Sequence, residues 1–161
     1  MMIGIAHMAE MGLLSSVAAP ALVRWARRPL RLDALAVPGA VALPLFVAFH
    51  AAVVLGMAAG AVPETWHVPA HALLLAAAIV FWLPVFGDRR RLGGAGRMVY
   101  LFAAMPSLDL PALAVIARGD SPGGLAMVIT MMPIGVLAVI TTLRWMFAEE
   151  ARVRAMEGGP R

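Results

Sequence analysis

The sequence predicts an all-α membrane protein, a polytopic bundle of about five transmembrane helices. The chain has 161 residues, of which 62% are hydrophobic and only 14% are charged. This composition lies far outside the range of soluble globular domains. The charges also fall in short bursts between long apolar stretches. Such a pattern is typical of helices that each cross a bilayer.

Five apolar segments have the length of a membrane span, because a helix needs about 20 residues to cross a hydrocarbon core of about 30 Å. The expected spans are residues 2–23, 35–61, 65–86, 97–117 and 124–147. Residues 1–148 are expected to form one helical domain, followed by a charged cytoplasmic tail over residues 149–161. Prolines interrupt the spans, and we expect kinks there because neighbouring helices and waters can satisfy the freed carbonyls. These prolines are Pro20, Pro38, Pro44, Pro84, Pro106, Pro111 and Pro133.

Arginine determines the expected orientation, since all thirteen basic residues are arginines. The arginine-rich stretches RWARRPLR, GDRRRLGGAGR and EEARVRAMEGGPR follow the first, third and fifth segments. Basic loops stay in the cytoplasm, so the N-terminus is expected outside and the C-terminus inside. The four tryptophans lie near span ends and are expected to be interfacial anchors. They are Trp25, Trp66, Trp82 and Trp145.

The four histidines gather in the outer half of the predicted membrane. His7 lies near the outer end of the first span, and His67 and His71 lie in the first two turns of the third. His50 lies about ten residues before the outer end of the second span, at about 1.5 Å per residue. Intramembrane ionisable groups are expensive and usually functional. The histidine layer is therefore the candidate functional region.

The same layer contains soft and acidic side chains. His7 and Met11 are spaced i, i+4, as are His67 and His71, so each pair projects from one helix face. Imidazole and thioether together suit copper, and thioether especially suits Cu(I). The expected copper ligands are His7, Met11, His50, His67 and His71. Other groups expected near this layer are Met8, Met57, Met127, Met131, Met132, Glu10 and Asp109.

Other interpretations remain open at this point. A membrane methionine usually serves packing, and a single histidine often forms a hydrogen bond between helices. The histidines with Glu10 and Asp109 could instead form a proton pathway. The protein could also be a small accessory subunit of a respiratory or photosynthetic complex, or a copper or proton transporter.

Several functional classes are not expected. The chain has no cysteine, so it has neither a disulfide framework nor a CxxC metal site. No nucleophile–base pair, phosphate-binding loop or nucleotide fingerprint occurs, so we expect no enzyme. The net charge of +4 comes from arginines at helix ends and does not indicate a nucleic-acid partner. The stretch MMIGIAHMAEM lacks a basic region, so no cleaved signal peptide is expected.

Motifs along most of the chain resemble those of the CtaG-like membrane proteins, which are required for assembly of caa3-type cytochrome c oxidase. HMAEMGLLSSVAAPALVRWARRP is similar to the start of that family's pattern, with Met11 at the position of its second histidine. FH at residues 49–50 stands where the family has Trp-His, and HVPAHALLLAAAIVFWLP corresponds to its paired-histidine helix. GDSPGGLAMV and the later RW match its last motifs, with Val128 in place of a tryptophan.

The resemblance implies a bacterial inner-membrane protein that helps to assemble a haem-copper oxidase by supplying copper, with oxidase subunits and the lipid bilayer as partners. All four histidines fall on family histidine positions. The family usually has further N-terminal helices, which this sequence does not show. Ala70 stands where the family has a glutamate between the paired histidines. Since a carboxylate commonly orients a ligating imidazole, we expect Glu10 or Asp109 to approach a histidine from another helix.

Overall fold

The computed structural model describes residues 5–157 and confirms the all-α fold class, with no strand in this range. The first span is α1 (Ile5–Leu13), the π-helical turn η1 (Leu14–Ala18) and α2 (Ala19–Ala26), which run on without a break. The other elements are the 3-10 turn η2 (Leu32–Leu35), α3 (Gly39–Ala58), the 3-10 turn η3 (Glu64–Trp66), α4 (His67–Phe86), α5 (Gly94–Ala117) and α6 (Ser121–Glu157).

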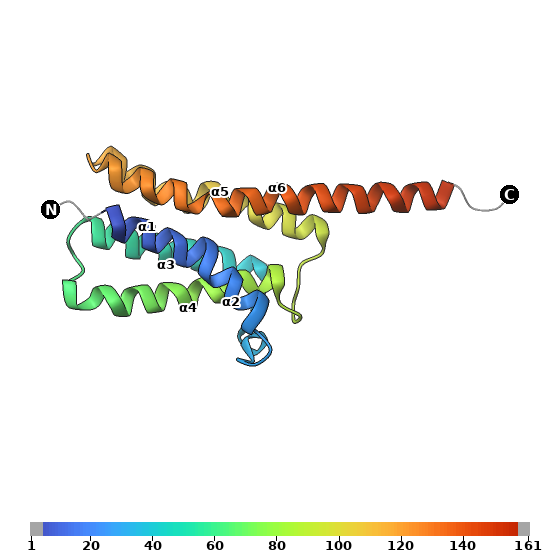
Figure 1. Ribbon diagram of the computed structural model, residues 1–161, viewed down its shortest axis with the longest axis horizontal. Helices are drawn as coiled ribbons and strands as arrows, with labels where there is room; N and C mark the ends of the chain where they lie inside the picture. Colours follow the sequence, from blue (N-terminus) through green and yellow to red (C-terminus); the bar gives the residue numbers. More distant parts are fainter. Residues whose placement is uncertain (1–4, 158–161) are drawn as a thin grey trace.

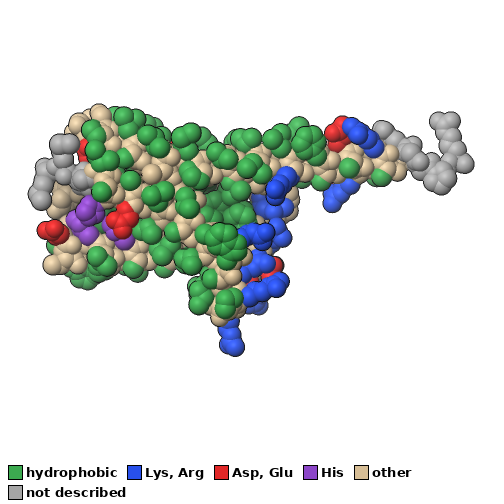
Figure 2. All heavy atoms as spheres, viewed as in Figure 1, with side chains coloured by type: hydrophobic (Ala, Val, Ile, Leu, Met, Phe, Trp, Pro, Cys, Tyr) green, Lys and Arg blue, Asp and Glu red, His purple; other side chains and the backbone are tan. Residues whose placement is uncertain are grey.

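Five helical segments in this range are long and apolar enough to cross a membrane. Their outward side chains are largely aliphatic, as at Leu45, Leu110 and Ile129, each more than 60% exposed. In Figure 2 hydrophobic side chains are spread over the visible face of the bundle, between the charged groups at its ends. An apolar surface of this extent requires lipid rather than water around it. The chain is therefore a multi-pass membrane protein.

The helices form one bundle in which spans far apart in the sequence also pack side by side (Figure 1). α6 packs along α5 and also against α1, while α3 contacts both α4 and α5. α2 packs against α4. The C-terminal end of α6 extends beyond the other helices (Figure 1).

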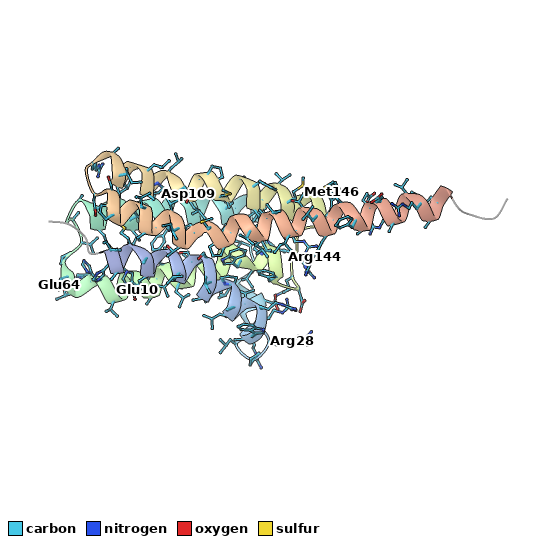
Figure 3. The ribbon with its side chains drawn as sticks, turned by 45° about the horizontal axis from the view of Figure 1, so that its top comes forward. Glu10, Arg28, Glu64, Asp109, Arg144 and Met146 are labelled. Carbon is cyan, nitrogen blue, oxygen red and sulfur yellow. The ribbon has the colours of Figure 1, made fainter. Side chains whose placement is uncertain are left out.

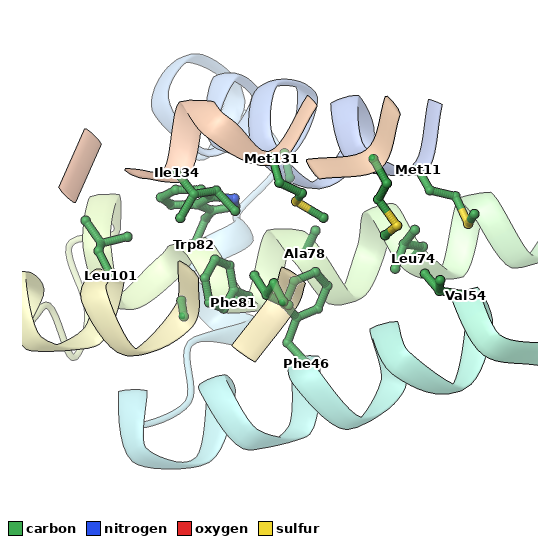
Figure 4. Close-up of a cluster of buried hydrophobic side chains, with 14 of the residues drawn as sticks. Met11, Phe46, Val54, Leu74, Ala78, Phe81, Trp82, Leu101, Met131 and Ile134 are labelled. Carbon is green, nitrogen blue, oxygen red and sulfur yellow. The ribbon is translucent and has the colours of Figure 1, made fainter. Parts of the chain in front are cut away.

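Aromatic side chains fill the middle of the core (Figure 4). The ring of Phe81 lies 4.8 Å from Phe46 and 5.2 Å from both Trp82 and Tyr100, measured between ring centroids. The Tyr100 hydroxyl donates a 2.7 Å hydrogen bond to the Phe81 carbonyl. These ring contacts join α3, α4 and α5. The hydrogen bond also gives the buried polar end of Tyr100 a partner.

Trp82 corrects one sequence-based prediction. Its side chain is completely buried, so the expectation of an interfacial anchor was wrong. The reason lies in the π-helical turn. The Ala19 amide bonds the Leu14 carbonyl, and Pro20, the next residue, has no N–H. The Ser15 carbonyl is left without either helical donor, and the Trp82 indole N–H donates to it at 2.7 Å.

The helix ends differ slightly from the predicted boundaries. The second span begins at Gly39, because Pro38 precedes the helix in an extended conformation. The fifth helix does not end at residue 147 but continues to Glu157. Ion pairs one turn apart, Arg152 with Glu149 and Arg154 with Glu150, support this extension. The first residues of the predicted first span and the last of the tail lie outside the described range.

Candidate functional site

The histidine-bearing end of the bundle is formed by α1 and the start of α4. Figure 2 shows histidine and acidic side chains at this end and the arginines toward the other. Figure 3 labels Glu10 and Glu64 at the same end, with Arg28 and Arg144 far from them. The separation of imidazoles and arginines that the sequence predicts is therefore present in the fold.

Three imidazole rings come together here. The ring centroid of His7 lies 5.4 Å from that of His67 and 6.0 Å from that of His71. His67 and His71 lie one turn apart on α4, and His7 reaches them from α1. His7 is exposed, His67 half-buried and His71 buried. These three residues are called the histidine cluster below.

A carboxylate approaches the histidine cluster from α1, as predicted from the alanine at residue 70. The Oε1 atom of Glu10 lies 3.7 Å from Nδ1 of His71. This distance is too long for a hydrogen bond, but it confirms that an acid on another helix faces a paired histidine. The other imidazole nitrogen, Nε2 of His71, is buried and has no hydrogen-bond partner. Asp109 on α5 also has a buried carboxylate oxygen, Oδ1, without a partner.

His50 lies apart from the histidine cluster. It is completely buried in α3, and the ring recorded against it in residues 5–157 is Phe46, at 5.7 Å. Neither imidazole nitrogen has a hydrogen-bond partner. The backbone of Leu108 on α5 is close to the ring but outside hydrogen-bonding geometry. His50 therefore takes no part in the ring contacts among His7, His67 and His71.

The methionines of the predicted layer are mostly packing residues. Met8 and Met11 are completely buried in the core, as is Met127, while Met132 is 60% exposed. Figure 4 places Met11 on the inner side of its helix, near Leu74 and Val54 of the core cluster. His7, four residues earlier on α1, is exposed. Met11 therefore belongs to the hydrophobic core.

The fit of a copper ion can be tested on the ring positions. Two imidazoles that share one ion at N–metal distances of about 2.0 Å hold their centroids roughly 5 to 6.5 Å apart. The two centroid distances of His7 fall in this range. In the described part of the chain, however, no three His, Asp or Glu side chains converge as a metal-binding group. The spacing of the rings is compatible with a shared ion, but the side chains as placed do not form a metal-binding group.

The fold and these residues define a multi-pass helical membrane protein with a cluster of ionisable side chains at one end. Comparisons with protein-family models, curated proteins and solved structures gave no match.

Proposed function

We propose that this protein binds copper at the histidine cluster and helps to assemble a haem-copper cytochrome c oxidase in a bacterial inner membrane. The observation that carries the copper part is the meeting of three imidazoles from two helices within 6.0 Å. The oxidase part rests on the resemblance of the sequence motifs to the CtaG-like proteins. The role is delivery or holding of a metal rather than catalysis.

The environment of each imidazole supports this use. His71 is buried with an unpartnered Nε2, and a buried polar atom without a partner costs free energy that a bound ion would recover through the nitrogen lone pair. Glu10 faces Nδ1 of the same ring, where a carboxylate can fix the tautomer and raise ligand basicity. His7 and His67 are more exposed, so they can change rotamer as an ion enters.

The five predicted ligands have different standing in this proposal. His7, His67 and His71 carry it. Met11 and His50 are ligand predictions from the sequence that the proposed site leaves out, because both are buried away from the ring contacts. A soft thioether next to imidazoles would favour Cu(I). If α1 rotated about its axis so that Met11 joined the site, its sulfur would favour the Cu(I) state of the bound ion.

Copper binding is tested with the purified protein under reducing conditions. We expect His67→Ala and His71→Ala each to lower Cu(I) affinity at least about tenfold, the scale on which lost metal-site interactions act. The double variant should lose little more than either single one, because ligands of one ion act together. Met132→Leu is the matched control, since it removes an exposed sulfur elsewhere. Equal binding by all four variants and wild type, or no binding by any, contradicts the copper site.

The oxidase role has a separate readout. Cells that lack the protein should contain less assembled, copper-loaded oxidase, and the wild-type chain should restore it while the His67→Ala, His71→Ala variant should not. If the protein binds copper but its loss does not change the amount of assembled oxidase, the copper site stands and the assembly role is rejected. Copurification in constant stoichiometry with a complex would instead favour the accessory-subunit alternative.

A further inference from the structure

A basic pocket lies between the helices at the end opposite the histidine cluster. It has a volume of about 460 Å³ and is lined by residues of α2, α4, α5 and α6. Six arginines line it, from helices and from the loop before α5. They are Arg24, Arg27, Arg91, Arg97, Arg144 and Arg152. This group is called the arginine pocket below.

The charge of the arginine pocket is poorly neutralised by the protein. Arg27 is paired with Asp88 and Arg152 with Glu149. In residues 5–157 the other four lining arginines take part in no recorded salt bridge. Arg91 is close enough to Arg97 to repel it, and the buried Nε of Arg97 has no hydrogen-bond partner. Several guanidiniums held together in this way call for an external anion.

The start of α5 borders the same pocket. Gly94, the first residue of α5, lines the pocket. The first helical hydrogen bond is donated by the Arg97 amide to the Gly93 carbonyl. The three preceding amides have no acceptor within the helix, and no side chain caps this end. Backbone amides at a helix start favour phosphate and other anions.

The arginine pocket continues into an apolar surface, and this favours a lipid over a free ion as its ligand. Leu137 and Ile140 of α6 line the arginine pocket and also an apolar groove that continues along α6 to Ile129. Ile140 also borders a second apolar groove between α5 and α6 that includes Phe102 and Met105. An amphiphile could place its headgroup among the arginines and an acyl chain in either groove.

From these observations we infer that the arginine pocket binds the phosphate headgroup of one anionic phospholipid, with an acyl chain along α6. Basic pockets between transmembrane helices are suited to acidic lipid headgroups. The arginines are then more than orientation signals, because a bound lipid would join α2, α4, α5 and α6 at this end. The inference is independent of copper binding.

The test uses the full-length protein exchanged into vesicles of phosphatidylcholine with or without phosphatidylglycerol. Native mass spectrometry measures retained lipid, and thermal unfolding measures stabilisation by each lipid. We expect the wild type to retain phosphatidylglycerol in preference to phosphatidylcholine. Arg97→Gln with Arg144→Gln should weaken this binding roughly 30-fold, the combined effect of two arginines near an anionic lipid. The control is Arg28→Gln with Arg154→Gln, which removes the same charge outside the pocket and should keep wild-type affinity.

Each contrary outcome rejects the inference. Equal retention of the two lipids by the wild type does so without any variant. Equal loss in the two double variants would mean that only net charge attracts the lipid. If inorganic phosphate stabilises the detergent-solubilised wild type as strongly as phosphatidylglycerol at equal concentration, the acyl chain contributes nothing and the pocket is a free-anion site instead. If the pocket variant does not fold, Arg144→Gln alone, at an exposed residue, takes its place with the same expected direction.

Discussion

Two of the four histidines are buried with unpartnered nitrogens, and their surroundings give them different roles. His71 has a carboxylate at 3.7 Å and faces the ring of His7. His50 has the ring of Phe46 beside it and neither nitrogen paired. Both residues are predicted ligands because of their depth in the membrane, and His71 also because it is spaced i, i+4 from His67. Only the tertiary contacts separate them, because depth along a helix says nothing about the direction in which a side chain points.

His50→Leu provides the prediction at the residue scale. An unpaired buried polar group costs about 1–3 kcal/mol, and its apolar replacement loses no hydrogen bond. We therefore expect the variant to unfold at the same or a higher temperature than wild type in detergent, and to bind the same amount of copper. His50→Gln, which keeps a polar group at this position, should not be stabilised. A marked loss of stability in His50→Leu would show that the imidazole has a partner, and a loss of copper would return it to the ligand set.

The approach of Glu10 to the cluster could be predicted from the sequence, whereas the position of Trp82 could not. Ala70 leaves the paired histidines without a carboxylate on their own helix. Few acidic residues lie at a similar depth, so Glu10 and Asp109 were the only candidates on other helices. For Trp82, the position near a span end suggested an interface. The indole is buried because Ser15 on another helix offers a free carbonyl, and no local pattern contains that pairing.

At the scale of elements, the first span shows how one proline organises two helices. Pro20 has no backbone N–H to donate, and in the π-helical turn η1 the Ala19 amide bonds the Leu14 carbonyl. The Ser15 carbonyl is thereby freed and accepts a hydrogen bond from α4. π-Helical turns often occur where a helix must satisfy such a mismatch. The sequence predicts a kink at this proline, but the partner that satisfies the freed carbonyl depends on the packing of α2 against α4.

Trp82→Phe tests this connection. Phenylalanine keeps most of the packing but removes the N–H, which leaves the Ser15 carbonyl buried without a donor. We expect the free energy of unfolding to fall by about 1–3 kcal/mol, measured by thermal or denaturant unfolding in detergent. Trp25→Phe is the matched control, because Trp25 is 80% exposed and should leave stability unchanged. Equal stability of both variants would mean that the indole contributes packing alone.

Close helix approach is a second element-scale feature that the sequence did not indicate. A Cβ atom added at Gly12 of α1 would lie 1.9 Å from Oγ1 of Thr130 on α6. The Ser16 hydroxyl, one turn later, donates a 2.5 Å hydrogen bond to the Thr130 carbonyl. Small residues let membrane helices approach and form such bonds. Glycine in a hydrophobic segment does not reveal which of its faces has a neighbour, so this contact required the fold.

The whole molecule is polarised along its long axis, with imidazoles at one end and, apart from Arg118 after α5, the guanidiniums of residues 5–157 at the other (Figure 2). The sequence predicted this polarity and the five spans, because both depend only on hydropathy and on the positions of charges along the chain. It did not predict the arginine pocket. Its arginines come from distant parts of the sequence, and sequence analysis explained each of them as an orientation signal.

The orientation of this axis in the membrane is the last prediction, and both proposed sites depend on it. Because arginine-rich loops are retained in the cytoplasm, the arginine pocket should face inside and the histidine cluster outside. A reporter active only in the cytoplasm should be active when fused after Arg161 and silent when inserted near Glu64, in the exposed turn before α4. A reporter active only outside should give the reverse pattern, which controls for expression. If the cytoplasmic reporter is active at Glu64, the histidine cluster lies in the inner half of the membrane, where copper could not be passed to an outward-facing partner. The arginine pocket would then face the outer leaflet, and the lipid inference would have to be tested against that leaflet's composition.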